Sequence, residues 1–133
     1  MKIETKKASL NKSQNEIFEF LSDFRNFEKL MPKDKIEKWT ATSETCSFNI
    51  SGMADIGMKI EKTVPHSEIN IISHGKNPFE FTLNVYIEPE GLDKSIAFFI
   101  FRGDINPFLK MMAEKPLTNF FNMLVAKMEE IYG

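Results

Sequence analysis

The sequence predicts an α+β fold in which a long C-terminal helix lies on an antiparallel sheet. Two observations support this prediction. Apolar and polar residues alternate in short runs between Ile36 and Gly103, which is typical of strands with one buried face. Residues 106–131 instead repeat apolar residues at helical spacing along one side. Because a strand and two short helices are expected before the sheet region, the predicted order is β-α-α-β6-α.

The chain before Pro32 predicts the strand and the two short helices. Residues 2–10 mix lysines and glutamates with single apolar residues, which suits a strand at the edge of a sheet. Ser13 and Glu16 have the spacing of a capping box, so a helix is expected to begin there. Pro32 marks the end of the second short helix.

The sheet region predicts six strands after the helices. The region begins at Ile36, and its later runs are 46–50, 56–64, 69–73, 79–87 and 93–102, with Gly, Pro and Asn turn signals between them. The run 79–87 alternates apolar and polar residues without exception. In the run 56–64 the predicted apolar face consists of Ile56, Met58, Ile60 and Val64.

The last predicted strand is apolar on both faces. The face without charges, expected inside, holds Ala97, Phe99 and Phe101. The opposite face carries an apolar stripe of Ile96, Phe98 and Ile100. Because an exposed apolar stripe often marks a protein contact, this one predicts a homodimer interface. The alternative is that the strand is covered on both faces within one chain.

Residues 106–131 form the predicted long helix. Asn106 is a suitable N-cap, and Pro107 suits the first helical turn. The apolar side of the helix consists of Phe108, Met111, Met112, Leu117, Phe120, Phe121, Leu124, Met128 and Ile131. Pro116 cannot donate a hydrogen bond to the carbonyl of Met112, so the helix is expected to kink or break there. The one-sided pattern predicts that this helix covers the sheet.

Composition limits the classes of function. The 133 residues suit a single domain that spans 1–133. A net charge of −2 gives no overall attraction to nucleic acid. The single cysteine, Cys46, excludes an internal disulfide and fits a reducing compartment. The start MKIETKKASL lacks the apolar segment of a signal peptide, and no apolar run could span a bilayer, so a cytoplasmic protein is expected.

The sequence offers few residues for catalysis or metal binding. His66 and His74 lie at predicted turns without a Cys/His cluster, so no metal site is expected. Cys46 lies in an apolar strand pattern, which predicts a buried and inert thiol. Asp23 and Asp55 are the candidate general bases. Asp23 lies at a helix end and Asp55 near a turn, which favours solvated surface carboxylates instead. We therefore predict no catalytic residue and no cofactor.

The order of elements and three local patterns resemble the START-like or SRPBCC superfamily, also described as birch-pollen-allergen-like. The patterns are NKSQNEIFEFLSDFRNFEKLMP at the helix entry, FRGDINPF at the last strand exit, and KPLTNFFNML in the long helix. The resemblance covers nearly the whole chain and is closest to small bacterial members. It implies the helix-grip fold, in which a seven-stranded curved sheet wraps around the C-terminal helix and encloses a cavity. It also implies that relatives bind lipids, sterols, polyketides or other apolar molecules, without a universal catalytic motif.

Such a cavity would be lined by apolar residues of the sheet and the long helix. The candidate ligand-binding residues are Trp39, Phe48, Met58, Ile71, Phe81, Leu83, Phe99, Phe101, Met112, Phe120, Phe121 and Leu124. The alternative is that these side chains fill the interior themselves, since burial alone accounts for them. The predicted function is non-catalytic binding of an apolar small molecule that is lipid-, isoprenoid- or polyketide-like. A polyketide cyclase- or aromatase-like enzyme and a protein-interaction module without ligand are the alternatives.

Overall fold

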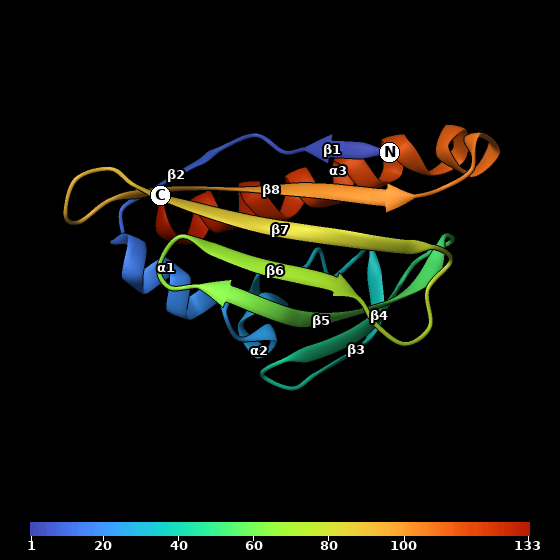
Figure 1. Cartoon of the computed structure of the whole chain (residues 1–133), viewed down its shortest axis with the longest axis horizontal. Coiled ribbons are helices and arrows are strands. Elements are labelled where there is room, and N and C mark those ends of the chain that lie inside the picture. The colour runs from blue at the N-terminus through green and yellow to red at the C-terminus, as the bar shows by residue number, and fades with distance from the viewer.

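A curved antiparallel sheet packs against the long C-terminal helix in the computed structural model, which describes residues 1–133 (Figure 1). The strands are β1 (Lys2–Glu4), β2 (Ala8–Leu10), β3 (Ile36–Ala41), β4 (Thr45–Ile50), β5 (Ala54–Val64), β6 (Glu68–Ser73), β7 (Glu80–Pro89) and β8 (Ser95–Asp104). Their order in the sheet is β1-β8-β7-β6-β5-β4-β3, and β2 also pairs with β8. The α+β helix-grip fold and the six strands after the helices are therefore confirmed.

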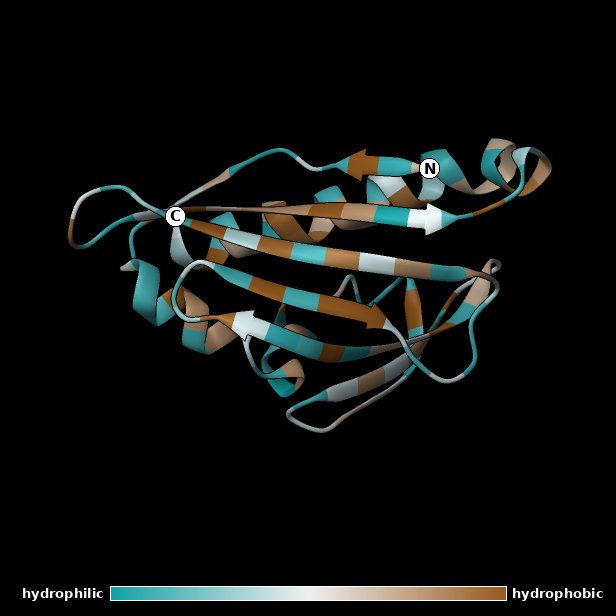
Figure 2. Ribbon diagram, in the orientation of Figure 1, coloured by the Kyte–Doolittle hydropathy of each residue, from teal (hydrophilic) through white to brown (hydrophobic).

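The long pair β7–β8 follows the predicted alternation (Figure 2). On β7 the side chains that point inward and are buried are Phe81, Leu83, Val85 and Ile87. On β8 they are Ala97, Phe99 and Phe101, as the face without charges predicted. Because period-two alternation fixes which face is apolar, it also fixes the register in which the two strands pair.

The predicted first strand is interrupted at Thr5, which separates β1 from β2. Thr5 is buried, and its hydroxyl oxygen accepts a hydrogen bond from the backbone N–H of Phe99 at 2.9 Å. The backbone N–H of Thr5 donates to the carbonyl of Phe99 at 3.0 Å. A side chain thus replaces one backbone acceptor of the ladder, so residues 2–10 form two short strands on β8 instead of one.

Strand β5 contains a bulge that changes the side on which its last residues lie. Ile60 pairs with Ile71 but Lys62 pairs with Asn70, so Glu61 is an extra residue on β5. An extra residue reverses the alternation beyond it. The prediction that Val64 lies on the apolar face was therefore wrong: its side chain is 46% exposed.

Strand β3 forms a free edge of the sheet and is irregular. Its register against β4 shifts between Glu37 and Thr40. Lys38, inside the shift, has φ +57°, a left-handed conformation that is uncommon for a residue with a side chain. On the inward side of β3, Trp39 packs against the core, and its ring centroid lies 5.5 Å from that of Phe48.

Two short helices and a 3₁₀ turn lie between β2 and β3. They are α1 (Gln14–Leu21), α2 (Phe24–Phe27) and η1 (Glu28–Leu30). The predicted capping box is confirmed, since Ser13 Oγ accepts from the Glu16 N–H at 3.2 Å and a Glu16 carboxylate oxygen accepts from the Ser13 N–H at 3.4 Å. The Gln14 side-chain amide donates to the carbonyl of Ile87 at 2.9 Å, which ties α1 to the end of β7.

The long helix α3 (Pro107–Tyr132) has a buried half and an exposed half. Its buried residues all follow Pro116 and are Leu117, Phe120, Phe121, Leu124, Val125 and Met128. Figure 1 shows the first turns projecting beyond the end of β8. Phe108, Met111 and Met112 lie there and are 65%, 77% and 61% exposed. The predicted stripe therefore covers the sheet only from Leu117 to Met128, because the helix is longer than the sheet beneath it, and Ile131 near its end is 41% exposed.

The start of α3 is capped as predicted, and the helix continues through its internal proline. The Asn106 side-chain oxygen accepts from the Leu109 N–H at 2.9 Å. Pro116 lies inside one helix that runs from Pro107 to Tyr132, so the helix does not break there. No helix of the chain, α3 included, is long and apolar enough to cross a membrane.

The outer stripe of β8 is partly covered within the chain. Ile96, Phe98 and Ile100 are half-buried. The ring of Tyr86 stacks on that of Phe98 at 5.3 Å, and the Lys7 ammonium lies 5.0 Å from the Phe98 ring centroid. Tyr86 and Lys7 therefore cover part of the Phe98 ring within one chain. A homodimer contact through the stripe stays a prediction.

Candidate functional site

The space between the sheet and α3 is filled with side chains. The interior void measures only about 10 Å³, close to the least volume that can hold one water. Its lining consists of Phe48, Ile50, Ile56, Met58, Phe79, Phe81, Phe101, Leu117, Phe120 and Phe121. In this conformation, therefore, the interior has no room for a small molecule.

Stacked aromatic rings fill this interior. Phe120 of α3 stacks on Phe48 of β4 with centroids 5.8 Å apart. Phe121 of α3 lies 5.0 Å from Phe101, whose ring lies 5.2 Å from Phe81. Pairs at these distances add to the free energy gained from burial alone. The many phenylalanines thus pack against one another and not around a ligand-sized space.

An open groove of about 580 Å³ lies at the end of the molecule where α3 begins. Its walls are the end of the loop before β3, the β4–β5 turn, the segments flanking β7 and β8, and α3 up to Met123. The lining consists of Lys35, Ile50, Ser51, Gly52, Met53, Ala54, Pro78, Phe79, Ile105, Leu109, Met112, Ala113, Lys115, Pro116, Asn119, Phe120 and Met123. Most of this surface is apolar.

The structure distributes the predicted ligand-binding residues over three places. In the groove lie Met112 and Phe120. Around the filled interior lie Phe48, Met58, Phe81, Phe101 and Phe121, which Phe120 also reaches. Lining neither space are Trp39, Ile71, Leu83, Phe99 and Leu124. The groove also contains residues of turns and links, such as Met53 and Ile105, that have no periodic pattern by which the sequence could have indicated them.

The first half of α3 is expected to open more readily than the second. Hydrogen exchange of the amides of residues 110–115 should be at least about tenfold faster than that of residues 117–131. The reason is that no side chain of α3 before Leu117 is buried. Mass spectrometry or NMR can measure both sets in one sample. Residues before Lys110 are left out because they lack a backbone partner within the helix. Equal protection of the two sets would contradict a mobile first half.

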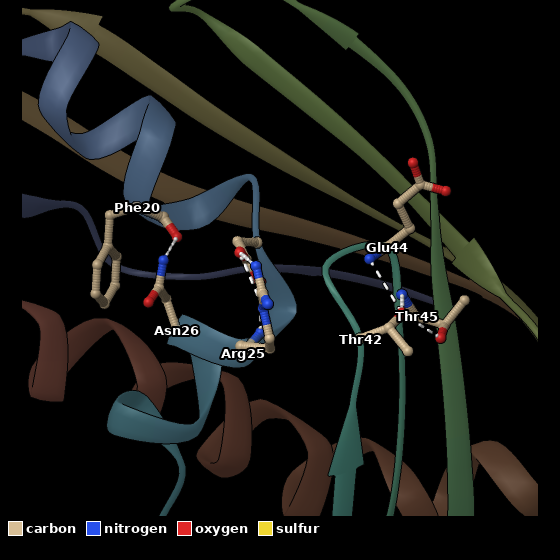
Figure 3. Close-up of polar contacts among 7 residues, drawn as sticks. Phe20, Arg25, Asn26, Thr42, Glu44 and Thr45 are labelled. Carbon is tan, nitrogen blue, oxygen red and sulfur yellow. Dashed lines mark hydrogen bonds and ion pairs between the residues drawn. The ribbon is translucent and has the colours of Figure 1, made fainter.

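The two candidate carboxylates have structural partners on the surface. Asp23 accepts from the backbone N–H of Arg25 at 2.9 Å and pairs with its guanidinium at 2.6 Å, so Asp23 caps α2. Figure 3 labels Arg25 and marks its polar contacts with dashed lines. Its side-chain hydrogen bond with Arg25 lowers the pKa of Asp23. The pKa of Asp55 is lowered chiefly by a hydrogen bond from Asn49. A lowered pKa means that a carboxylate accepts a proton less readily, so both are poor general bases near neutral pH.

The remaining reactive side chains lie outside the groove. Cys46 is buried, and burial raises the pKa of its thiol to about 12, as expected for an inert cysteine. His66 and His74 are exposed, and the ring of His66 packs edge-on against Phe18. A second hollow of about 480 Å³ near His74 and Asp55 is lined by few hydrophobic residues. No group of three or more His, Cys, Asp or Glu side chains gathers anywhere in the chain.

Comparison with known proteins identifies the fold. No protein-family model matches this sequence, and no curated protein matches it. A START superfamily protein from Mycobacterium smegmatis matches with a TM-score of 0.68 and 14% identity, over 98% of each chain. Norcoclaurine synthase from Thalictrum flavum, in complex with dopamine and hydroxybenzaldehyde, matches with a TM-score of 0.71 and 11% identity, over 98% of this chain and 85% of that one.

A third similar structure is the di-domain ARO/CYC protein BexL from the BE-7585A biosynthetic pathway. It matches with a TM-score of 0.73 and 9% identity, over 98% of this chain and 45% of its own. All three similarities extend over nearly the whole of this chain. The chain therefore has the same fold as these three proteins, the helix-grip fold that the resemblance implied.

Proposed function

We propose that this protein binds an apolar small molecule without transforming it, and that the ligand lies in the open groove at the start of α3. The observation that carries the proposal is the exposed apolar surface of the groove. Leu109, Met112 and Met123 line it and are 36%, 61% and 39% exposed. The exposed part of an apolar side chain gains nothing from folding, but a ligand that covers it gains about 25 cal/mol for each Å² removed from water.

The size and composition of the groove support the same proposal. Ligand sites typically measure roughly 300–1,000 Å³ and are mostly apolar with a few polar groups. The groove, at about 580 Å³, falls within this range and has four polar side chains, Lys35, Ser51, Lys115 and Asn119. Its methionines add adaptability, since an unbranched thioether side chain can adjust to ligands of different shape. The similar structures include one that holds dopamine and hydroxybenzaldehyde.

An enzyme of the polyketide cyclase or aromatase kind is the alternative. Such chemistry usually requires a positioned acid or base next to the bound substrate. The groove has no carboxylate, histidine or cysteine in its lining, and its two lysines, Lys35 and Lys115, are exposed to water. Binding alone therefore fits the residues of the groove better than acid–base catalysis does.

Native mass spectrometry of freshly purified protein, beside an organic extract of the same sample, tests the proposal. We expect a reproducible adduct that the extract identifies as an apolar molecule. A clean mass of the free chain, together with no binding of the neutral apolar dye N-phenyl-1-naphthylamine, would overturn the proposal.

Filling the groove should abolish binding of that dye. Ala113→Trp places a large side chain in the groove lining, so we expect at least about tenfold weaker dye binding, measured by fluorescence titration. Glu114→Trp is the matched control, because Glu114 is the next residue on the same helix and does not line the groove. Equal affinity of the two variants, both with unchanged circular dichroism, would place the dye elsewhere.

A further inference from the structure

The groove has two charges in its lining, and both are positive. Lys35 precedes β3 and Lys115 lies on α3, so the two come from different walls. The loop that carries Lys35 is fixed to the β4–β5 turn, because the Ser51 N–H donates to the Lys35 carbonyl at 2.9 Å. The positive groove contrasts with the whole chain, whose net charge is −2.

Neither lysine has an acidic partner within the chain. The cations that form ion pairs are Lys2, Lys12, Arg25, Lys76, Lys110 and Lys127. Glu114, the neighbour of Lys115, has its carboxylate 3.8 Å from the ammonium of Lys110 instead. The charges of Lys35 and Lys115 are therefore available to a ligand.

Both lysine side chains are exposed although they contribute to an apolar groove. A lysine in this situation lays its methylene stem along the apolar surface and keeps its ammonium group in water. The groove thus combines an apolar floor with cations at its rim. Ser51 and Asn119 add neutral hydrogen-bonding groups to the same lining.

We propose that the ligand is an amphiphile with one anionic head group, whose apolar body lies in the groove while the head lies at Lys35 and Lys115. This inference rests on the proposed function, since it specifies the chemistry of the molecule bound there. An exposed ion pair typically raises affinity by up to about fivefold, so two lysines give up to about 30-fold. The anionic head therefore selects among ligands, and the apolar body supplies most of the affinity.

Three twelve-carbon probes that differ only in their head group test the inference: dodecanoate, 1-dodecanol and dodecylamine. Each is titrated against the whole chain by displacement of N-phenyl-1-naphthylamine, below the concentration at which the probe aggregates. We expect dodecanoate to bind about 5- to 30-fold more tightly than dodecanol, and dodecylamine to bind most weakly. Because the lysines are exposed, this preference should shrink as the salt concentration rises.

Neutral lysine variants identify the residues responsible. Lys35→Gln with Lys115→Gln should remove the preference for dodecanoate while leaving dodecanol affinity within about twofold. Lys110→Gln is the matched control, because Lys110 lies on the same helix outside the groove lining. It should keep the preference.

The outcomes separate this inference from the proposed function. If dye and probes all fail to bind, the proposed function fails. If the probes bind with equal affinity, or if Lys110→Gln loses the preference as fully as the double variant, the proposed function stands and the anionic head is wrong. Binding to phosphatidylglycerol vesicles without binding of dissolved dodecanoate would also overturn the inference, since the lysines would then recognise a membrane surface.

Discussion

Phe99→Ala is expected to lower the free energy of unfolding by about 3–5 kcal/mol, the usual cost of removing a buried phenylalanine ring. Phe99 is 0% exposed, and its ring stacks on that of Phe27 at 6.4 Å. The sequence made Phe99 a candidate for ligand binding, but the structure places it away from the groove and the interior void. Its role is therefore expected to be stability, measured by urea denaturation.

Phe108→Ala is the matched control for that experiment. The side chain of Phe108 is 65% exposed on the projecting half of α3, so its removal should change the free energy of unfolding by no more than about 0.5 kcal/mol. Equal losses in the two variants would contradict the division of α3 into a packed half and a projecting half. A small loss for Phe99→Ala would mean that the interior is loosely packed.

Gly57→Ala is expected to destabilise the protein by about 3 kcal/mol or more. A Cβ atom on Gly57 would collide with the backbone carbonyl oxygen of His74, which cannot move aside as a flexible side chain can. The loop after β6 is tied down there, because the His74 N–H donates to the Gly57 carbonyl at 2.9 Å. Asn77 closes the same contact, accepting from the Gly57 N–H at 3.0 Å and donating to its carbonyl at 3.1 Å.

Gly52→Ala provides the comparison, with thermal denaturation of both variants as the measurement. Gly52 has φ +75° and open space where a Cβ would lie. Its substitution should cost only about 1 kcal/mol, from backbone strain without a collision. A larger loss for Gly52→Ala than for Gly57→Ala would show that backbone conformation, and not close approach, dominates at these turns.

The sequence predicted those parts of the fold that depend on local patterns. Ser13 with Glu16 and Asn106 satisfy backbone N–H groups within one helical turn, so their spacing alone indicates where a helix begins. Alternation along 79–87 identified the buried face of β7 for the same reason. Patterns of this kind require no knowledge of the distant residues that pack against them.

Features that depend on contacts between distant segments were not predictable in this way. Thr5 interrupts the first strand through a bond to Phe99, far along the chain. The bulge at Glu61 depends on how β5 pairs with β6, and no local pattern in the sequence marks it. Whether phenylalanines surround a cavity or fill it depends on volume, which periodicity does not measure. The groove joins loops and a helix end, so only Met112 and Phe120 of its lining had been identified as candidates.

The irregular edge strand β3 affects how readily separate molecules of this protein aggregate. An unpaired edge offers a row of backbone donors and acceptors to any other strand, and regular edges are where chains begin to join into fibres. The register shift between Glu37 and Thr40, with Lys38 in a left-handed conformation, interrupts that row. Resistance to aggregation along this side therefore depends on the backbone shape of a few residues such as Lys38, whose side chain is exposed and adds little to the packed interior.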